Sequence, residues 1–83
     1  MSDKQKRDKA VDDFAEAMKV RLDEKANEGY TGWDGGFPTK KLRESIDRDS
    51  WKMVRDGNDD KAVDIANRCM MLWFRAKEAQ DAG

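Results

Sequence analysis

The chain has 83 residues and a mass of 9.6 kDa, which is enough for one small domain. Charged residues make up 42% of it, and 17 basic against 18 acidic side chains leave a formal net charge of -1. This balance argues against nonspecific binding of nucleic acid. The sequence contains no histidine, which excludes serine triads and histidine zinc sites. So small and polar a chain builds only a thin core, and we expect a second copy to complete it, in a dimer or a tetramer.

The ends of the chain and its single cysteine favour a soluble, cytoplasmic protein. Cys69 has no partner for an intrachain disulfide, which is typical of a reducing compartment. The charged first residues lead into no apolar run long enough for a signal peptide or a membrane span, so we expect no membrane contact. Residues 1–8 are predicted to form a charged flexible terminus, residues 9–79 a single helical domain, and residues 80–83 a C-terminal tail.

Apolar residues recur every three or four positions over about residues 9–27, which predicts an amphipathic helix. The following segment, residues 28–38, holds four of the six glycines and the only proline, so the helix ends there. Tyr30 and Trp33 in this segment either pack against the helices or stack on the base of a bound ligand. The apolar stripe of the first helix comprises Val11, Phe14, Ala15, Met18 and Leu22.

Two further helices are predicted after this loop. Thr39 is the expected N-cap of a second helix that reaches about residue 55 and carries only a narrow apolar stripe. A third helix over about residues 60–79 is the most apolar part of the chain. We therefore expect it to be central, to contact both neighbours or a second subunit, and to carry the surface that a partner copy covers. Cys69 on that helix is expected to be a small buried hydrophobe. The sequence therefore predicts an all-α, three-helix unit with a glycine-rich aromatic loop between its first two helices, completed by homo-oligomerisation.

Carboxylates at helical spacing are the main candidates for chemistry. Glu44 and Asp47 lie three residues apart on the second predicted helix, and Asp64 lies near the start of the third. Antiparallel packing of these two helices would bring their facing sides together. Such a group of carboxylates suits a magnesium ion, which prefers oxygen ligands. The alternative is a solvated charged face that binds nothing.

The sequence of the third predicted helix resembles a known protein family. Residues 63–72, VDIANRCMML, resemble the D-[VI]-A-N-x-x-M-M segment of small phage-encoded proteins related to the MazG-like all-α nucleotide pyrophosphohydrolases. Residues 14–18 and 29–33 resemble the segments that precede it in those proteins, and the similarity spans roughly residues 14–77. The resemblance implies a nucleotide-related ligand and, for a phage-encoded protein, the cytoplasm of a bacterial host.

The magnesium-binding pattern of that family is only partly present. The family has two adjacent glutamates and a third three residues on, then a glutamate and an aspartate three apart. Residues 43–47, RESID, align with the first part, and residues 61–64, KAVD, align with the second. Glu44, Asp47 and Asp64 keep an acid in this alignment. These three carboxylates are the metal ligands only if the chain is an enzyme.

Two basic residues occupy positions where the family has acidic residues. Arg43 and Lys61 each replace a negative ligand, which changes the local charge by about two units at each position. The resemblance therefore implies a nucleotide pocket whose catalytic metal site has been lost, with Arg43, Lys61 and nearby Arg48 holding phosphate. The alternative is that Arg43 and Lys61 form surface ion pairs with Asp47 and Asp64.

These features lead us to expect a small phage-type helical protein that binds a nucleotide or cyclic oligonucleotide without turnover and without a cofactor. Such a protein would sequester a host nucleotide signal in counter-defence. One alternative is a Mg²⁺-dependent nucleoside triphosphate pyrophosphohydrolase, in which Glu16 or Glu24 assists the three carboxylates. The other is a helical inhibitor that binds a host protein. The expected ligand-binding residues are Arg43, Arg48, Lys61, Tyr30 and Trp33.

Overall fold

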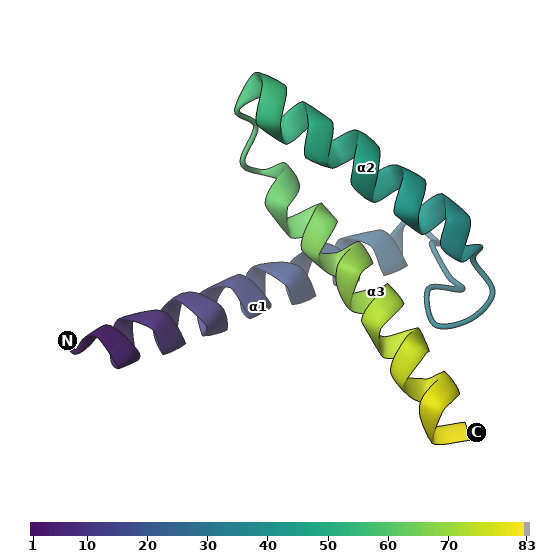
Figure 1. The fold of residues 1–83 in the computed structure, drawn as a ribbon, viewed down its shortest axis with the longest axis horizontal. Helices are drawn as coiled ribbons and strands as arrows, with labels where there is room; N and C mark the ends of the chain where they lie inside the picture. The colour runs from purple at the N-terminus through teal and green to yellow at the C-terminus, as the bar shows by residue number, and fades with distance from the viewer. Residues whose placement is uncertain (83) are drawn as a thin grey trace.

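The computed structural model describes residues 1–82, which form three α-helices and no strand (Figure 1). The helices are α1 (Asp3–Asn27), α2 (Thr39–Asp56) and α3 (Lys61–Ala82). The predicted all-α, three-helix fold is therefore confirmed. Within the described residues, none of these helices is both long and apolar enough to cross a membrane. Gly83, the last residue of the predicted tail, lies outside the described residues.

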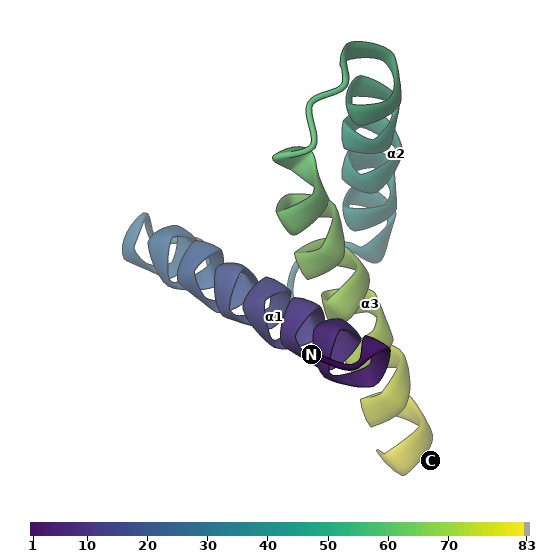
Figure 2. The ribbon, with the colours of Figure 1, turned by 90° about the vertical axis from the view of Figure 1, so that its left-hand side faces the viewer.

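The third helix is the centre of the fold, as its apolar content predicts. α2 and α3 run antiparallel side by side, and α1 crosses α3 at a wide angle (Figures 1 and 2). In residues 1–82, α3 packs against both other helices, whereas no Cα atom of α1 lies within 8 Å of one in α2. Gly57 ends α2 in the left-handed conformation, with φ of 67°, and its N–H donates to the Met53 carbonyl at 3.0 Å.

The first helix begins six residues before the predicted start at residue 9. Ser2 is its N-cap: the hydroxyl accepts from the Gln5 backbone N–H at 3.1 Å, and the Gln5 side chain accepts from the Ser2 N–H at 2.9 Å. This reciprocal capping box satisfies two backbone donors that would otherwise lack partners. Residues 3–8, predicted to be a flexible terminus, are therefore helical, and ion pairs such as Lys4–Asp8 at 2.6 Å support the first turns.

The second helix begins without the predicted threonine cap. Pro38 is the N-cap, Thr39 is already the first helical residue, and no side chain caps the helix. The Pro38 carbonyl accepts from the backbone N–H of Leu42 at 3.3 Å and so closes the first turn. The prediction was wrong by one position because the proline, with φ of -62° and an extended ψ of 129°, supplies the turn into the helix itself.

The most buried side chains are mainly polar. Leu42, at 4% exposure, is the only buried apolar residue in the described part of the chain, whereas Asp49 and Asn67 are 2% and 4% exposed. Asp49 on α2 accepts hydrogen bonds from the Arg68 guanidinium on α3 and, at 3.4 Å, from Arg48. Burial alone would raise the pKa of Asp49. The hydrogen bond and charge of Arg68, together with smaller contributions from Arg48 and Lys61, outweigh the effect of burial, so the pKa lies below its ordinary value.

Removing the Arg68 charge should destabilise the fold strongly. Arg68→Met leaves the buried Asp49 carboxylate without its main partner, and we expect a loss of about 3–5 kcal/mol in the free energy of unfolding. Urea denaturation followed by circular dichroism measures this loss. Lys40→Met is the matched control, because the Lys40–Glu44 pair is exposed and 4.0 Å long; it should change stability by about 0–1 kcal/mol. Equal effects of the two substitutions would contradict a structural role for the buried pair.

The lowered pKa of Asp49 predicts an acid-dependent loss of stability. The stabilisation that the ionised Asp49 carboxylate provides is fully present above the unfolded-state pKa of about 3.9. It is lost as the pH falls through the lower pKa of Asp49 in the folded state. Free energies of unfolding measured between pH 2 and pH 7 should therefore fall less steeply in acid for Asp49→Asn than for the unmodified chain. Identical acid slopes would show that the charge of Asp49 does not contribute.

Candidate ligand-binding site

The loop of residues 28–38 folds back onto α3. The Phe37 N–H donates to the Gly32 carbonyl at 2.8 Å, and the Arg75 guanidinium donates to the carbonyls of Phe37 at 2.6 Å and Gly35 at 3.0 Å. Gly32 adopts φ of 83°, and a Cβ there would lie 3.2 Å from the Phe37 nitrogen, so the tight turn requires glycine. One arginine of α3 thus fixes the position of a loop that has no regular secondary structure.

The two aromatic residues expected to bind ligand have different environments. Trp33 packs against Phe74 of α3, with ring centroids 5.2 Å apart. Tyr30 is 66% exposed, and the Lys25 ammonium lies 5.1 Å from its ring centroid. Trp33 is therefore part of the packing between loop and helix, whereas most of the Tyr30 ring is accessible. Both side chains border the same cavity.

This larger cavity has a volume of 860 Å³ and lies among the end of α1, the loop, the start of α2 and the middle of α3. A cavity of this size is within the range that holds a small organic ligand. Its apolar walls include Leu42 and the two adjacent methionines of α3. Charged and polar side chains interrupt this apolar lining, with as many acids as cations among them: Arg21, Asp23, Lys25, Thr31, Asp34, Ser45, Asp64, Asn67 and Arg68.

Asn67 is the buried polar residue of this lining. Its amide nitrogen donates to the Met18 carbonyl of α1 at 3.2 Å, which fixes the amide orientation and makes the other terminal atom the oxygen. That oxygen, Oδ1, is buried and has no hydrogen-bond partner. A buried acceptor without a partner costs about 1–3 kcal/mol, so a ligand that donates an N–H or O–H to Asn67 would recover this energy.

Arg68 connects the cavity to a group of cations. It borders the cavity and pairs with Asp49, which also accepts from Arg48 and is influenced by the charge of Lys61. Two arginines therefore pair with one buried carboxylate and a lysine lowers its pKa, so the cations that act on Asp49 exceed the charge of this one acid. Such an excess favours a phosphate or another anion beside the cavity.

The predicted phosphate-binding residues are thus only partly brought together. Arg48 and Lys61 both lie near Asp49, which supports grouping them. Arg43 is exposed on α2 and borders neither of the two described cavities. Its side chain takes part in none of the described ion pairs, so the alternative in which Arg43 pairs with Asp47 is not observed either.

The predicted metal ligands do not meet in this chain. Within residues 1–82, no three Asp, Glu or Cys side chains are close enough together to hold a metal ion. Glu44 and Asp47 are exposed on α2, whereas Asp64 faces α1 and pairs with Arg21 at 3.0 Å. The expectation that antiparallel packing gathers these carboxylates fails because the face of α2 turned toward α3 carries Leu42 and Asp49 instead.

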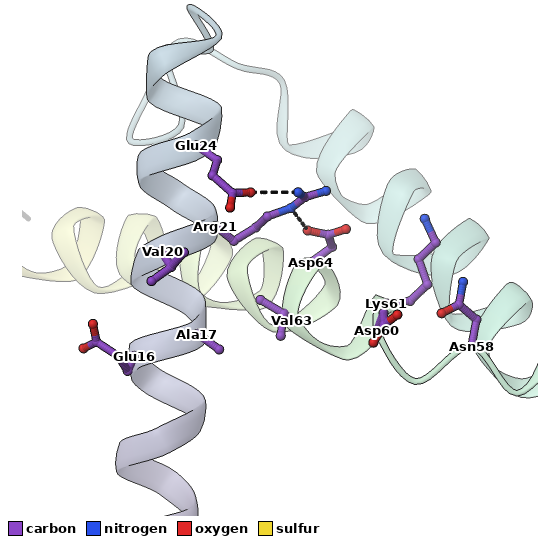
Figure 3. A pocket seen from close by; sticks show the side chains of 10 residues that line it. All are labelled: Glu16, Ala17, Val20, Arg21, Glu24, Asn58, Asp60, Lys61, Val63 and Asp64. Atoms are coloured by element: carbon purple, nitrogen blue, oxygen red, sulfur yellow. Dashed lines mark hydrogen bonds and ion pairs between the residues drawn. The ribbon is translucent and has the colours of Figure 1, made fainter.

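A smaller groove of 520 Å³ lies between α1 and the start of α3 (Figure 3). Glu16, Glu24 and Asp64 border it, and these are acids that the pyrophosphohydrolase alternative would use. Figure 3 shows the Arg21 guanidinium between two of them, at 3.0 Å from Glu24 and 3.0 Å from Asp64. The hydrogen bonds to Asp64 and Glu24 raise the pKa of Arg21. A permanent cation therefore neutralises the position where a metal ion would contact both carboxylates.

Cys69 is exposed, which corrects the prediction that it is a buried hydrophobe. Trp73, one helical turn further along α3, is also exposed. The two side chains share a face of α3 that neither α1 nor α2 covers. Helical periodicity identified the apolar surface of α3 but did not indicate which part of it the other helices cover.

The sequence prediction missed several residues that define the site. Asn67 and Arg68 interrupt the most apolar run of the chain, and this interruption is the signal that marks them as buried polar groups. Arg21 and Arg75 gave no comparable signal, because each is one of many charged residues on a predicted helix surface. Their roles depend on a contact with a segment more than 35 residues away.

No protein-family model, curated protein or solved structure matches this chain. The site is therefore defined by its own geometry: a partly apolar cavity, one accessible aromatic ring, a buried amide oxygen and adjacent cations. This combination suits a planar, hydrogen-bonding organic group that carries negative charge.

Arg75 should control the order of the loop. Arg75→Ala removes both hydrogen bonds to the loop carbonyls, so the backbone amides of residues 32–37 should exchange with solvent several-fold faster. Hydrogen–deuterium exchange with mass spectrometry measures this change. Lys77→Ala is the control, because Lys77 is a nearby exposed cation of α3 with no described contact to the loop. Unchanged exchange after the Arg75 substitution would refute the anchoring role.

Proposed function

We propose that the chain binds a nucleotide-like ligand in the 860 Å³ cavity and does not turn it over. The observation that carries this proposal is Asn67, a residue of the cavity lining whose buried Oδ1 has no hydrogen-bond partner among the described residues. Every nucleobase presents at least one N–H donor on its hydrogen-bonding edge. A base in the cavity would donate to Asn67 and recover the cost of the unpaired acceptor.

The aromatic and cationic residues support the same class of ligand. Tyr30 offers an accessible ring for stacking, which contributes about 1–3 kcal/mol for each base. Arg68 borders the cavity and belongs to the cation group around Asp49, so a phosphate attached to the base has a favourable position nearby. Two of the expected phosphate-binding residues, Arg48 and Lys61, belong to this proposal because they act on Asp49, although neither borders the larger cavity. Arg43 is left out because it has no described ion pair with Asp49.

The arrangement of the acids supports the part of the proposal that concerns binding without turnover. Hydrolysis of a nucleoside triphosphate by a magnesium enzyme requires several carboxylates around the ion. Here Arg21 pairs with Asp64, while Glu44 and Asp47 lie on the exposed face of α2. The resemblance to phage-encoded proteins extends the proposal to sequestration of a nucleotide signal of a bacterial host in counter-defence.

A second candidate is inhibition of a host protein through an exposed apolar surface. The observation that favours it is the exposure of Trp51 and Val54 on α2, at 59% and 81%. Tryptophan is one of the residues enriched among those that dominate the energy of protein interfaces. This candidate predicts no affinity for nucleotides.

Isothermal titration calorimetry against nucleoside triphosphates and cyclic oligonucleotides, with and without Mg²⁺, tests the proposal. We expect binding that does not require Mg²⁺ and releases no pyrophosphate. Tyr30→Ala should weaken it roughly 5- to 150-fold, because one stacking contact is lost. Trp51→Ala is the matched control: this exposed ring also carries a cation, the Arg55 guanidinium at 4.4 Å, but lies outside the cavity.

The possible outcomes separate the three functions. If Tyr30→Ala weakens binding and Trp51→Ala leaves it unchanged, the result supports the nucleotide site. Pyrophosphate release that depends on Mg²⁺ and is abolished by Asp64→Asn would establish the enzyme instead. No heat with any nucleotide would overturn the proposal and leave the protein-binding alternative.

A further inference from the structure

The single chain exposes more surface than a folded protein of its mass. A compact 9.6 kDa monomer has an accessible surface of about 5,100 Å², whereas this chain exposes 6,483 Å². Its radius of gyration is 14.6 Å, against about 12 Å for a compact chain of this length. The excess surface, roughly 1,400 Å², is more than the approximately 800 Å² that each partner buries in a standard protein interface.

Much of this excess belongs to the first half of α1. Figure 1 shows the N-terminal half of α1 extending away from α2 and from the crossing with α3. Residues 1–14 are all exposed, whereas Met18, Arg21 and Leu22 further along the helix are half-buried. An exposed α-helix of this length is rarely stable alone in water, so its persistence favours a packing partner.

The exposed half of α1 continues the apolar face that packs against α3. Val11 and Phe14 precede Met18 by seven and four residues, so all three share one face of the helix. Met18 lies at the crossing with α3, where its carbonyl accepts from Asn67. Val11 and Phe14 remain 66% and 40% exposed, so the described part of the chain leaves the N-terminal part of this face largely uncovered.

The charges along α1 indicate what that partner is. Residues 4–9 contain four basic residues and one acidic residue, whereas residues 12–16 contain three acidic residues and no basic one. Two copies of α1 packed antiparallel about Val11 place the basic segment of each against the acidic segment of the other. Parallel packing would place like charges together, which is unfavourable. The helix is thus complementary to itself in one orientation.

We propose that the apolar face of α1 around Val11 and Phe14 is the interface with a second copy of this chain, packed antiparallel about a two-fold axis near Val11. This inference is independent of the nucleotide proposal, because neither residue borders the larger cavity. A two-fold arrangement is closed and self-complementary, so it covers both exposed faces without forming an open filament. It also assigns the interface to α1, whereas the sequence pattern pointed to the third helix.

Sedimentation velocity tests the interface. The unmodified chain at about 100 µM should sediment with twice the 9.6 kDa mass of one chain. Val11→Glu combined with Phe14→Glu should give the mass of one chain, with α2 and α3 still helical by circular dichroism. The matched control is Trp51→Glu combined with Val54→Glu, which places the same charges on exposed apolar positions of α2 and should leave the dimer intact.

Disulfide trapping tests the orientation. In a Cys69→Ser background, chains with Arg7→Cys are mixed in equal amounts with chains with Ala15→Cys and then oxidised. Antiparallel packing about Val11 brings residue 7 of one chain opposite residue 15 of the other, so the mixed disulfide should dominate by mass spectrometry. Predominance of the 7–7 and 15–15 products would overturn the antiparallel arrangement. Three results would overturn the proposed interface. They are an unmodified chain that is monomeric, a dimer that persists after the α1 substitutions, and a dimer that dissociates after the α2 control substitutions.

Discussion

The polar contacts that α3 makes with its two neighbours determine how this fold is assembled. Among residues 1–82, only one apolar side chain, that of Leu42, is buried as completely as Asp49 and Asn67. Asp49 joins α2 to α3 through Arg68, and Asn67 joins α1 to α3 through the Met18 carbonyl. Because polar pairs contribute less net stabilisation than an apolar core, the fold depends on covering further apolar surface.

The same contacts shape the candidate site. Asn67, which lines the cavity, uses its amide nitrogen to hold α1, and its buried oxygen has no partner in residues 1–82. Arg68 holds α2 and also borders that cavity. Arg75 adds the loop that carries Tyr30, so three residues of one helix position the whole site. A ligand here and a second copy along α1 would each cover surface that the isolated chain leaves exposed.

Hydrophobic periodicity predicted the three helices and the central position of the third, because these depend mainly on local spacing. It missed the extra turns of α1, although Ser2 and Gln5 have the spacing of a capping box. The burial of Cys69 and the gathering of the carboxylates were predicted wrongly, since both depend on which faces of the helices meet. Pairing of Asp64 with Arg21, 43 residues earlier in the chain, has no local signature in the sequence.

The dependence of stability on chain concentration tests most directly whether a second copy completes this fold. Unfolding of a dimer to separate chains shifts with concentration by mass action, whereas unfolding of a monomer does not. We predict that the urea midpoint, followed by circular dichroism, rises steadily as the chain concentration increases from about 1 to 100 µM. A midpoint that stays constant over this range would contradict the account, because the polar contacts of α3 would then suffice to hold one chain folded.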